Sequence, residues 1–409
     1  MARAPIPIPM SPVPEDAVPA RRLFGIFLRL GLTAFGGPVA HLAYFHAEFV
    51  LRRRWLQEAD YAELVALCQL LPGPASSQVG MAIGLRHAGL PGALAAWAGF
   101  TLPSAVLMIG LALGLAHLGG GVPAGLLHGL KLVAVVVVAH AVWSMARLFC
   151  RAAGSAALAL LAAAALVAWP LPAVQIAVIA AGAVVGMAWM RPSVPGDVPA
   201  LPVRVSPVLA RGARWAFVVL LAGLPLWALL APGSMGEMLA AFYRAGALVF
   251  GGGHVVLPLL ETAVVGRGWM DADTFMSGYG AAQALPGPLF AFAGFLGAGM
   301  QAGPGGWAGG MLALVAVFLP SLLLVLGVMP IWEQARRDRR VRAAITGVNA
   351  VVVGVLLAAL VDPLWRSAVG DWRDAALVAA GVVALAGLRL PVWLLVPLMA
   401  LAGWPLSAG

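Results

Sequence analysis

The stretch Gln69 to Pro74, with the sequence QLLPGP, recurs as QALPGP from Gln283 to Pro288. A second element precedes each copy: Phe35-Gly36-Gly37 in the first half of the chain and Phe250-Gly251-Gly252 in the second. Because the two elements come in the same order twice, the chain reads as a duplication of one unit. Proline and glycine disrupt helices, so each element is expected to break an apolar segment near its middle.

Further landmarks extend the duplication on both sides. They are Arg29 with Arg244, Trp55 with Trp269, Pro103-Ser104 with Pro320-Ser321, and Gly129-Leu130-Lys131 with Gly347-Val348-Asn349. This order predicts one repeat at 22–190 and a second at 233–405. Residues 191–232 are expected to hold a linker and one extra membrane span. Residues 1–21, which are rich in proline and have no signal-peptide core, are expected to form a disordered cytoplasmic tail.

The composition indicates that lipid is the main solvent of this chain. Of 409 residues, 62% are hydrophobic and 10% are charged, and the mean hydropathy is +0.96. A water-facing surface cannot be covered with so few charges. Apolar runs occur at 94–118, 126–146, 156–190, 216–230, 311–330 and 343–361. We therefore expect an all-α polytopic membrane protein with about 10–13 membrane segments, given a hydrocarbon core of roughly 30 Å.

The positions of the arginines predict that the repeats have opposite orientations. Arg52-Arg53-Arg54 follows the first F-G-G element, whereas the matching segment of the second repeat has only Arg267. Conversely, arginines crowd 336–342, and the matching loop at 117–123 has no Arg or Lys. Short cytoplasmic loops carry an excess of these residues. The expected fold is therefore two homologous inverted repeats with broken or re-entrant helices, whose turns face protein or water because lipid cannot satisfy open backbone groups.

Half-helices that begin at membrane depth present unpaired N–H groups and the positive end of their dipole, which favours anions. Inverted repeats bring such ends together near the bilayer midplane. The turns are therefore the candidate ligands of a shared anion site. Their residues are Phe35, Gly36, Gly37, Pro72, Gly73, Pro74, Phe250, Gly251, Gly252, Gly253, Pro286, Gly287 and Pro288.

Two arginines at matched positions, Arg29 and Arg244, are candidate ligands because a guanidinium group fits a tetrahedral oxyanion and an ionisable residue at membrane depth is functional by default. The alternative is that both side chains extend to the membrane interface. The single lysine, Lys131, pairs by repeat with Asn349, and both are candidate ligands as well. The alternative for Lys131 is a structural ion pair with Glu48 or Glu63.

Uncharged polar residues near the turns complete the candidate set. Gln69 and Gln283 precede the P-G-P turns at the same spacing and are candidate donors to a ligand oxygen, or else they hold the broken helices together. His254 follows the second glycine run and His41 lies near the first. Either histidine could sense protons near neutral pH, or serve only in packing.

Several other functions are excluded or disfavoured. The formal net charge of +9 comes from arginines in short loops, as membrane topology predicts, so nucleic acid is not the expected partner. Cys68 and Cys150 lack metal-like spacing, and no metal or other cofactor is expected. The chain has no H-E-x-x-H, G-x-S-x-G or G-x-x-x-x-G-K-[ST] motif, which argues against an enzyme and against a nucleotide-driven pump.

The residues Phe27 to Gly31, Thr33, Phe35 to Pro38 and Gln69 to Pro74, with their counterparts in the second half, resemble the chromate ion transporter family in its long, two-domain form. The resemblance covers most of 22–360. It implies a multi-pass carrier of the bacterial cytoplasmic membrane that exports chromate and confers chromate resistance. It also implies transport driven by the membrane potential or the proton gradient, and homologous halves of opposite orientation.

The leading hypothesis is therefore a secondary carrier of chromate that works by alternating access between inverted repeats. Sulfate is an open alternative, because it has the same charge and nearly the same shape as chromate. An anion channel is another alternative, because it could use the same half-helix ends. Small-residue patches at Gly305-Gly306 and Gly309-Gly310 permit close helix contacts, so a homodimer is a further hypothesis.

Overall fold

A computed structural model describes residues 18–35, 37–118, 124–190, 205–230, 233–249, 256–332 and 338–403. These residues form helices and short loops, with no strand among them. The all-α fold expected from the sequence is confirmed. Residues 1–17 of the expected tail lie outside the described residues, and the first helix begins at Ala20.

The helices follow one another in the same order in both repeats. The first repeat holds α1 (Ala20–Thr33), α2 (Gly37–Phe45), η1 (His46–Arg52), α3 (Glu58–Leu70), α4 (Ala75–Leu118), α5 (Ala124–Phe149), α6 (Ala153–Ala168) and α7 (Pro172–Trp189). Helix α8 (Pro207–Leu230) separates the repeats. The second repeat holds α9 (Ser234–Ala247), α10 (Val256–Val264), α11 (Ala272–Ala282), η3 (Leu289–Ala291), α12 (Phe292–Gly299), α13 (Gly306–Val328), η4 (Met329–Ile331), α15 (Arg339–Ala359), η5 (Leu360–Trp365), α16 (Arg366–Ala368), α17 (Trp372–Val382), η6 (Val383–Gly387) and α18 (Val392–Gly403).

Helix α4 is two helices that meet at a sharp bend. Ala88 (φ −140°, ψ 22°) and Gly89 (φ 61°, ψ −152°) leave the helical region, so a first limb at 75–87 ends there and a second limb at 90–118 begins. The second repeat has the same arrangement in α12 and α13, which are separated by a loop at 300–305. The expected half-helices after both P-G-P turns are therefore confirmed.

Five helices in the described part of the chain are long and apolar enough to cross a membrane. They are Ala75–Ala116, His128–Phe149, Pro207–Leu230, Gly306–Ile331 and Arg339–Ala368. The first contains the bend of α4, so its membrane-length part is the second limb. Helices α6, α7 and α18 are shorter and also apolar. The chain is thus a multi-pass membrane protein, as its composition predicts.

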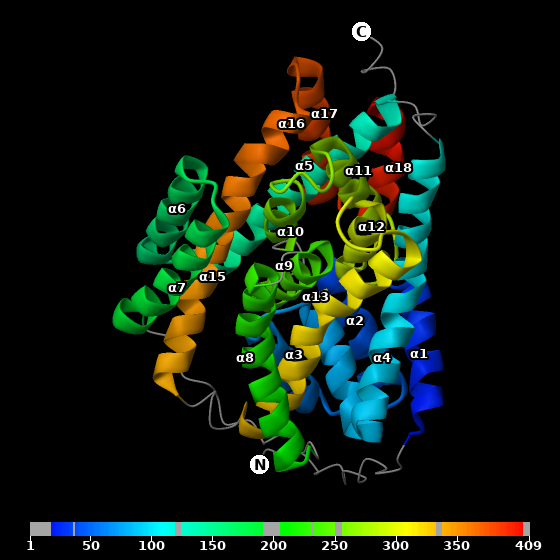
Figure 1. Cartoon of the computed structure of the whole chain (residues 1–409), viewed down its shortest axis with the longest axis vertical. Coiled ribbons are helices and arrows are strands. Elements are labelled where there is room, and N and C mark those ends of the chain that lie inside the picture. The colour runs from blue at the N-terminus through cyan, green and yellow to red at the C-terminus, as the bar shows by residue number, and fades with distance from the viewer. Residues whose placement is uncertain are drawn as a thin grey trace, which may run out of the picture.

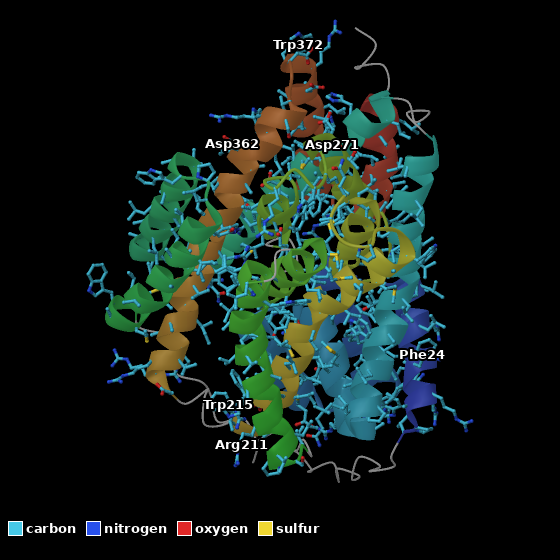
Figure 2. The ribbon with its side chains drawn as sticks, viewed as in Figure 1. Phe24, Arg211, Trp215, Asp271, Asp362 and Trp372 are labelled. Atoms are coloured by element: carbon cyan, nitrogen blue, oxygen red, sulfur yellow. The ribbon has the colours of Figure 1, made fainter. Side chains whose placement is uncertain are left out.

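Matched helices run in opposite directions in the two repeats (Figure 1). The second limb of α4 runs from the lower end of the view to the upper end, whereas α13 runs downward. Helices α1 and α15 both begin at the lower end, with Arg21 and Arg339, and Arg211 is labelled there in Figure 2. Asp271 and Asp362 are labelled at the upper end. Under the positive-inside rule, the lower end is the one expected to face the cytoplasm.

The two repeats exchange their last helices. Helices α6 and α7 of the first repeat pack against α15 of the second, and α17 and α18 of the second pack against α5 of the first. Matched glycines make the exchange possible: a Cβ on Gly347 would overlap the backbone of α7, and a Cβ on Gly129 would overlap the backbone of α18. Glycine allows such close helix approach in membranes. The repeats therefore form one interlocked body.

Candidate functional site

Both P-G-P turns place glycine in a backbone conformation that other residues avoid. Gly73 joins α3 to α4 with φ +122°, and Gly287 joins α11 to η3 with φ +94°. A side chain at either position would be strained, since positive φ brings Cβ against the backbone. Space is also lacking, because a Cβ on Gly73 would overlap Ser321 Oγ and a Cβ on Gly287 would lie 2.8 Å from Ser104 Oγ.

Each P-G-P turn is hydrogen-bonded to the other repeat. The N–H of Gly73 donates to the carbonyl oxygen of Val249 at 2.6 Å, and the N–H of Gly287 donates to the carbonyl oxygen of Ala34 at 3.0 Å. Val249 and Ala34 directly precede the second and first F-G-G elements. The four broken segments therefore meet in one place, and each pair joins a turn of one repeat to a segment of the other.

The serines that face the two glycines are also exchanged between repeats. Ser321 of α13 faces Gly73 of the first repeat, and Ser104 of α4 faces Gly287 of the second. Both serines follow a proline inside a helix, at Pro320 and Pro103. The Pro-Ser landmarks of the sequence are thus part of the same centre.

Polar side chains after the first P-G-P turn are buried at the centre. Gln78 Nε2 donates to the carbonyl oxygen of Pro72 at 2.7 Å. Ser76 Oγ lies 3.4 Å from His41 Nδ1, and His41 Nε2 lies 3.2 Å from the carbonyl oxygen of Ala34. A carbonyl only accepts, so Nε2 carries the proton and Nδ1 accepts from Ser76. His41 therefore connects the first turn to the hydrogen bond of the second.

Sequence reasoning did not single out Ser76, Ser77 and Gln78. A signal was present, since three polar residues follow Pro74 after a single alanine, Ala75, and precede an apolar run. In the structure these three side chains are at most 2% exposed. Burial of polar groups in the centre of a membrane protein requires hydrogen-bond partners or a ligand. These residues therefore belong to the candidate site beside the predicted turns.

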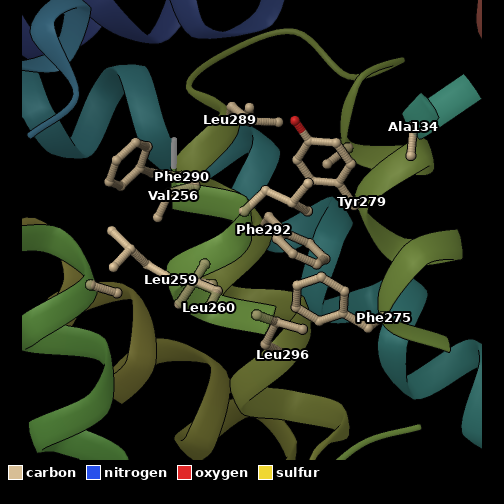
Figure 3. Close-up of a cluster of buried hydrophobic side chains, with 14 of the residues drawn as sticks. Ala134, Val256, Leu259, Leu260, Phe275, Tyr279, Leu289, Phe290, Phe292 and Leu296 are labelled. Atoms are coloured by element: carbon tan, nitrogen blue, oxygen red, sulfur yellow. The ribbon is translucent and has the colours of Figure 1, made fainter. Parts of the chain in front are cut away.

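The start of the helix after the second P-G-P turn is apolar instead. Leu289, Phe290 and Phe292 are almost fully buried there. The Phe292 ring lies 5.2 Å from the Phe275 ring and 5.7 Å from the Tyr279 ring, centroid to centroid. Figure 3 shows these side chains packed together. The two turns are alike in backbone and different in side-chain chemistry.

The structure brings together only part of the candidate set derived from the sequence. Pro72, Gly73, Pro74, Pro286, Gly287 and Pro288 form the joined turns, and Phe35 follows Ala34, which accepts one of the two hydrogen bonds. Gly37 begins α2. Gln283 is half-buried and Gln69 is exposed. The remaining turn residues, Gly36, Phe250, Gly251, Gly252, Gly253 and His254, lie outside the described residues.

The three candidate cations lie apart from one another. Arg29 is exposed on α1. Arg244 is half-buried and lines a small cavity of about 10 Å³ with Gln175 and Thr262. Lys131 Nζ lies 2.6 Å from Asp273 Oδ1. The structural partner of Lys131 is therefore Asp273 on α11, and the alternative of Glu48 or Glu63 is wrong.

Glu48 forms ion pairs with two arginines that follow it in the chain. Glu48 Oε1 accepts from Arg53 Nε at 2.7 Å, and Glu48 Oε2 accepts from Arg52 at 3.0 Å. Partial burial opposes ionisation of this carboxyl group, but the two guanidinium groups outweigh it and hold the pKa of Glu48 below its usual range. Asn349 is buried on α15, and its Oδ1 has no partner among the described residues.

Metal chemistry finds no support in the described part of the chain. No group of three or more His, Cys, Asp or Glu residues there could hold a metal ion. The donors at the joined turns are backbone N–H groups and hydroxyls, which suit an anion. The arrangement can therefore surround a small anion with oriented donors where the two repeats meet.

Comparisons with known proteins agree with this reading. A family model described as "Chromate transporter" matches residues 21–187 and again 236–404. The chain is 32% identical over 365 residues to the "Chromate transport protein" of Pseudomonas aeruginosa, with 83% of this chain and 80% of the relative covered. It is 28% identical over 405 residues to the "Chromate transport protein" of Cupriavidus metallidurans, with 92% of each covered.

A third relative extends the similarity over almost the whole chain. The "Probable chromate transport protein" of Synechococcus elongatus is 27% identical over 406 residues, with 95% of this chain and 96% of the relative covered. No solved structure matches the chain. The matched length makes the similarity a property of both repeats.

Proposed function

The chain belongs to the chromate transporter family, and from this premise we propose that it exports chromate across the bacterial cytoplasmic membrane as a secondary carrier and so confers chromate resistance. The observation that carries the proposal is the pair of exchanged hydrogen bonds, Gly73 to Val249 and Gly287 to Ala34. They join the broken segments of inverted repeats at one centre, which is the arrangement that anion carriers use at the midplane.

The proposed site consists of the turn residues, with charge supplied from the two F-G-G hairpins. Arg29 on α1 and Arg244 on α9 provide positive charge, and half-helix ends provide oriented N–H groups. The proposed repeats are 22–190 and 233–405, joined by 191–232, and the helices proposed to move within them are α3 and α11. A homodimer in the membrane is the proposed assembly.

A difference between the repeats supports alternating access. Helix α11 packs against α5, whereas α3, the counterpart of α11, packs against α4 and η1 and has no comparable packing with α15 in the described residues. Met276 and Tyr279 on α11 are buried, while their counterparts on α3 are the exposed Ala62 and the half-buried Val65. In the opposite state of the carrier, we propose, α3 docks on α15 and α11 is released from α5.

Cysteine accessibility tests this movement. In a protein with Cys68 and Cys150 replaced by alanine, Ala62→Cys is expected to react quickly with a water-soluble maleimide and Met276→Cys slowly. Added chromate is expected to change the two rates in opposite directions, because the two positions exchange their environments. Rates that stay fixed, or that change in the same direction, would contradict alternating access.

The substrate is tested by competition in inverted membrane vesicles. Uptake of chromate is expected to saturate, to collapse on addition of an uncoupler, and to be inhibited more strongly by unlabelled chromate than by sulfate, molybdate or phosphate. Stronger inhibition by sulfate would make sulfate the substrate. Uptake that fails to saturate and ignores the uncoupler would favour an anion channel over a carrier.

A further inference from the structure

The two helices that follow the P-G-P turns start with different residues. At matched positions, the first repeat has Ser76-Ser77-Gln78 and the second has Phe290-Ala291-Phe292. The first set is polar and buried, and the second is buried in an aromatic cluster (Figure 3). An anion needs hydrogen-bond donors when it leaves water. Only the first of these two helix starts offers them from its side chains.

Two hydroxyl groups at the first turn have unused hydrogen-bonding capacity. Ser77 Oγ, on the first limb of α4, and Ser321 Oγ, on α13, have no partner in the described part of the chain. Ser77 is 2% exposed and Ser321 is 0% exposed. A buried hydroxyl without a partner destabilises the fold, because it loses its hydrogen bonds to water and gains none in exchange. Two such groups at one turn therefore indicate a place for a bound ligand.

The position of Ser321 directs its hydroxyl to the turn. Its Oγ occupies the space that a Cβ on Gly73 would need, so it lies directly beside the loop from which the first limb of α4 starts. That limb spans 75–87, and the N–H groups of its first turn face the same loop. The counterpart serine, Ser104, is already used, because its Oγ donates to the carbonyl oxygen of Thr101 at 3.0 Å.

We infer that the transported oxyanion binds at the start of α4, where the hydroxyls of Ser77 and Ser321 and the first N–H groups of the helix donate to its oxygens. The inference rests on the proposed function and assigns the ligand site to the first P-G-P turn. The helix start after the second turn offers no hydroxyl or amide side chain, and this turn closes the centre through the bond from Gly287 to Ala34. Because Ser321 belongs to the second repeat, the anion holds the two repeats together while it is bound.

The amide nitrogen of Gln78 holds the turn in place and is not a ligand of the anion. Its Nε2 already donates to the carbonyl oxygen of Pro72, which keeps the turn in the shape that exposes the N–H groups of the helix start. Ser76 is held in a similar way by His41. Ser77 and Ser321 are thus the hydroxyls left for the ligand among the serines of the first turn.

Anion binding to the purified full-length protein tests the inference. Isothermal titration with chromate, molybdate and sulfate identifies the anions that the wild-type protein binds. Ser77→Ala and Ser321→Ala are each expected to weaken that binding about tenfold or more, since a hydrogen bond to a charged group contributes about 1.5–3 kcal/mol. Ser104→Ala is expected to weaken binding less, and Ser155→Ala, which removes a buried hydroxyl from α6, is expected to have no effect.

Two controls separate ligation from packing. Ser77→Cys and Ser321→Cys keep nearly the same volume but donate only weakly, so each is expected to behave like the alanine variant. Thermal unfolding without anion shows whether a variant has lost its fold, and binding is compared only among variants with wild-type melting temperatures. If one serine variant fails to fold, the other still tests the site.

The outcomes distinguish this inference from the proposed function. If the wild-type protein binds molybdate or sulfate and not chromate, the proposed substrate is wrong, and the serine variants are then compared with the bound anion. If Ser77→Ala and Ser321→Ala bind that anion as tightly as the wild type does, the assigned site is overturned. The site is also overturned if Ser104→Ala shows the larger loss, or if the wild-type protein binds none of the three anions.

Discussion

The N–H of Gly73 donates a 2.6 Å hydrogen bond to the carbonyl oxygen of Val249 in the other repeat. The matched glycine, Gly287, makes the corresponding bond to Ala34. Each bond starts from a turn whose backbone conformation requires glycine, and it ends at the residue that precedes an F-G-G element. The junction between the repeats therefore depends on the backbone conformations of Gly73 and Gly287, and substitutions at these glycines perturb it directly.

Gly73→Ala is expected to abolish chromate transport and to lower the free energy of unfolding by about 1–3 kcal/mol, because alanine is strained at positive φ. Its Cβ would also overlap Ser321 Oγ and lie 2.7 Å from Gln78 Nε2. The matched control is Gly25→Ala on α1, where a Cβ meets no atom within 4 Å. Vesicle uptake and membrane protein levels are measured together, and normal uptake by Gly73→Ala would contradict this account of the turn.

Arg29→Ala and Arg244→Ala are each expected to abolish chromate tolerance while protein levels in the membrane stay normal. The reason is the loss of positive charge from the F-G-G hairpins that flank the centre. Growth on chromate measures tolerance, and Arg→Lys at each position tests whether charge alone is enough. Normal tolerance in both alanine variants would remove the arginines from the mechanism.

The ion pair between Lys131 and Asp273 connects α5 to α11, so its loss is expected to loosen the docked state of α11. Asp273 is 68% exposed in its side chain, and such pairs contribute about 0.2–1 kcal/mol. Lys131→Ala and Asp273→Ala are therefore expected to change the transport rate by at most about fivefold. The double variant Lys131→Asp with Asp273→Lys re-forms the ion pair with its charges exchanged and is expected to restore the transport rate. If its rate is instead as low as the two single effects combined, the two residues do not act as a pair.

Glu48 contributes stability that depends on pH. The pKa of its carboxyl group is lower in the folded protein than in the unfolded chain, because Arg52 and Arg53 outweigh the effect of burial. The contribution is therefore present above the ordinary carboxyl pKa and is lost as the pH falls through the lowered value. Glu48→Gln is expected to reduce the melting temperature at neutral pH, with a gap to the wild type that closes in acid. A gap that stays constant with pH would contradict this role.

The repeats and their broken helices could be predicted from the sequence because the signal is local. Proline and glycine at Gln69–Pro74 and Gln283–Pro288 interrupt apolar runs, and the arginines at Arg52–Arg54 indicate the side to which the first hairpin returns. The structure confirms the broken helices, and the side to which the first hairpin returns stays a prediction. Helix breaks can be predicted because they depend on the backbone properties of individual proline and glycine residues and not on distant contacts.

The contacts between the repeats could not be predicted in the same way. Nothing in the sequence pairs Gly73 with Val249, because the hydrogen bond uses backbone groups that every residue has. The ion pair of Lys131 with Asp273 joins segments that are far apart in the chain. The sequence offers other acidic residues, such as Glu48 and Glu63, and does not show which of them Lys131 contacts. The packing of α6 and α7 of the first repeat on α15 of the second cannot be predicted from hydropathy either, because hydropathy does not indicate which helices are neighbours.

The sequence does not mark Ser77 as a ligand, and it marks Ser321 only as part of a repeated Pro-Ser pair. Charge is the strongest sign of function at membrane depth, so attention falls on Arg29, Arg244 and Lys131. Hydroxyl groups occur in membrane helices for many structural reasons and normally bond to their own backbone, as Ser104 does. Ser77 and Ser321 differ from Ser104 in being buried without a partner, and from the equally unpartnered Thr101 in lying at the first P-G-P turn.

Counterflow in proteoliposomes tests the central claim most directly. Vesicles that contain the purified protein are loaded with unlabelled chromate and diluted into a trace of labelled chromate. A carrier with one site exposed alternately to each side is expected to accumulate label transiently above equilibrium, and Gly73→Ala to accumulate none. Label that only equilibrates, or that accumulates with trapped sulfate and not with chromate, would contradict the account.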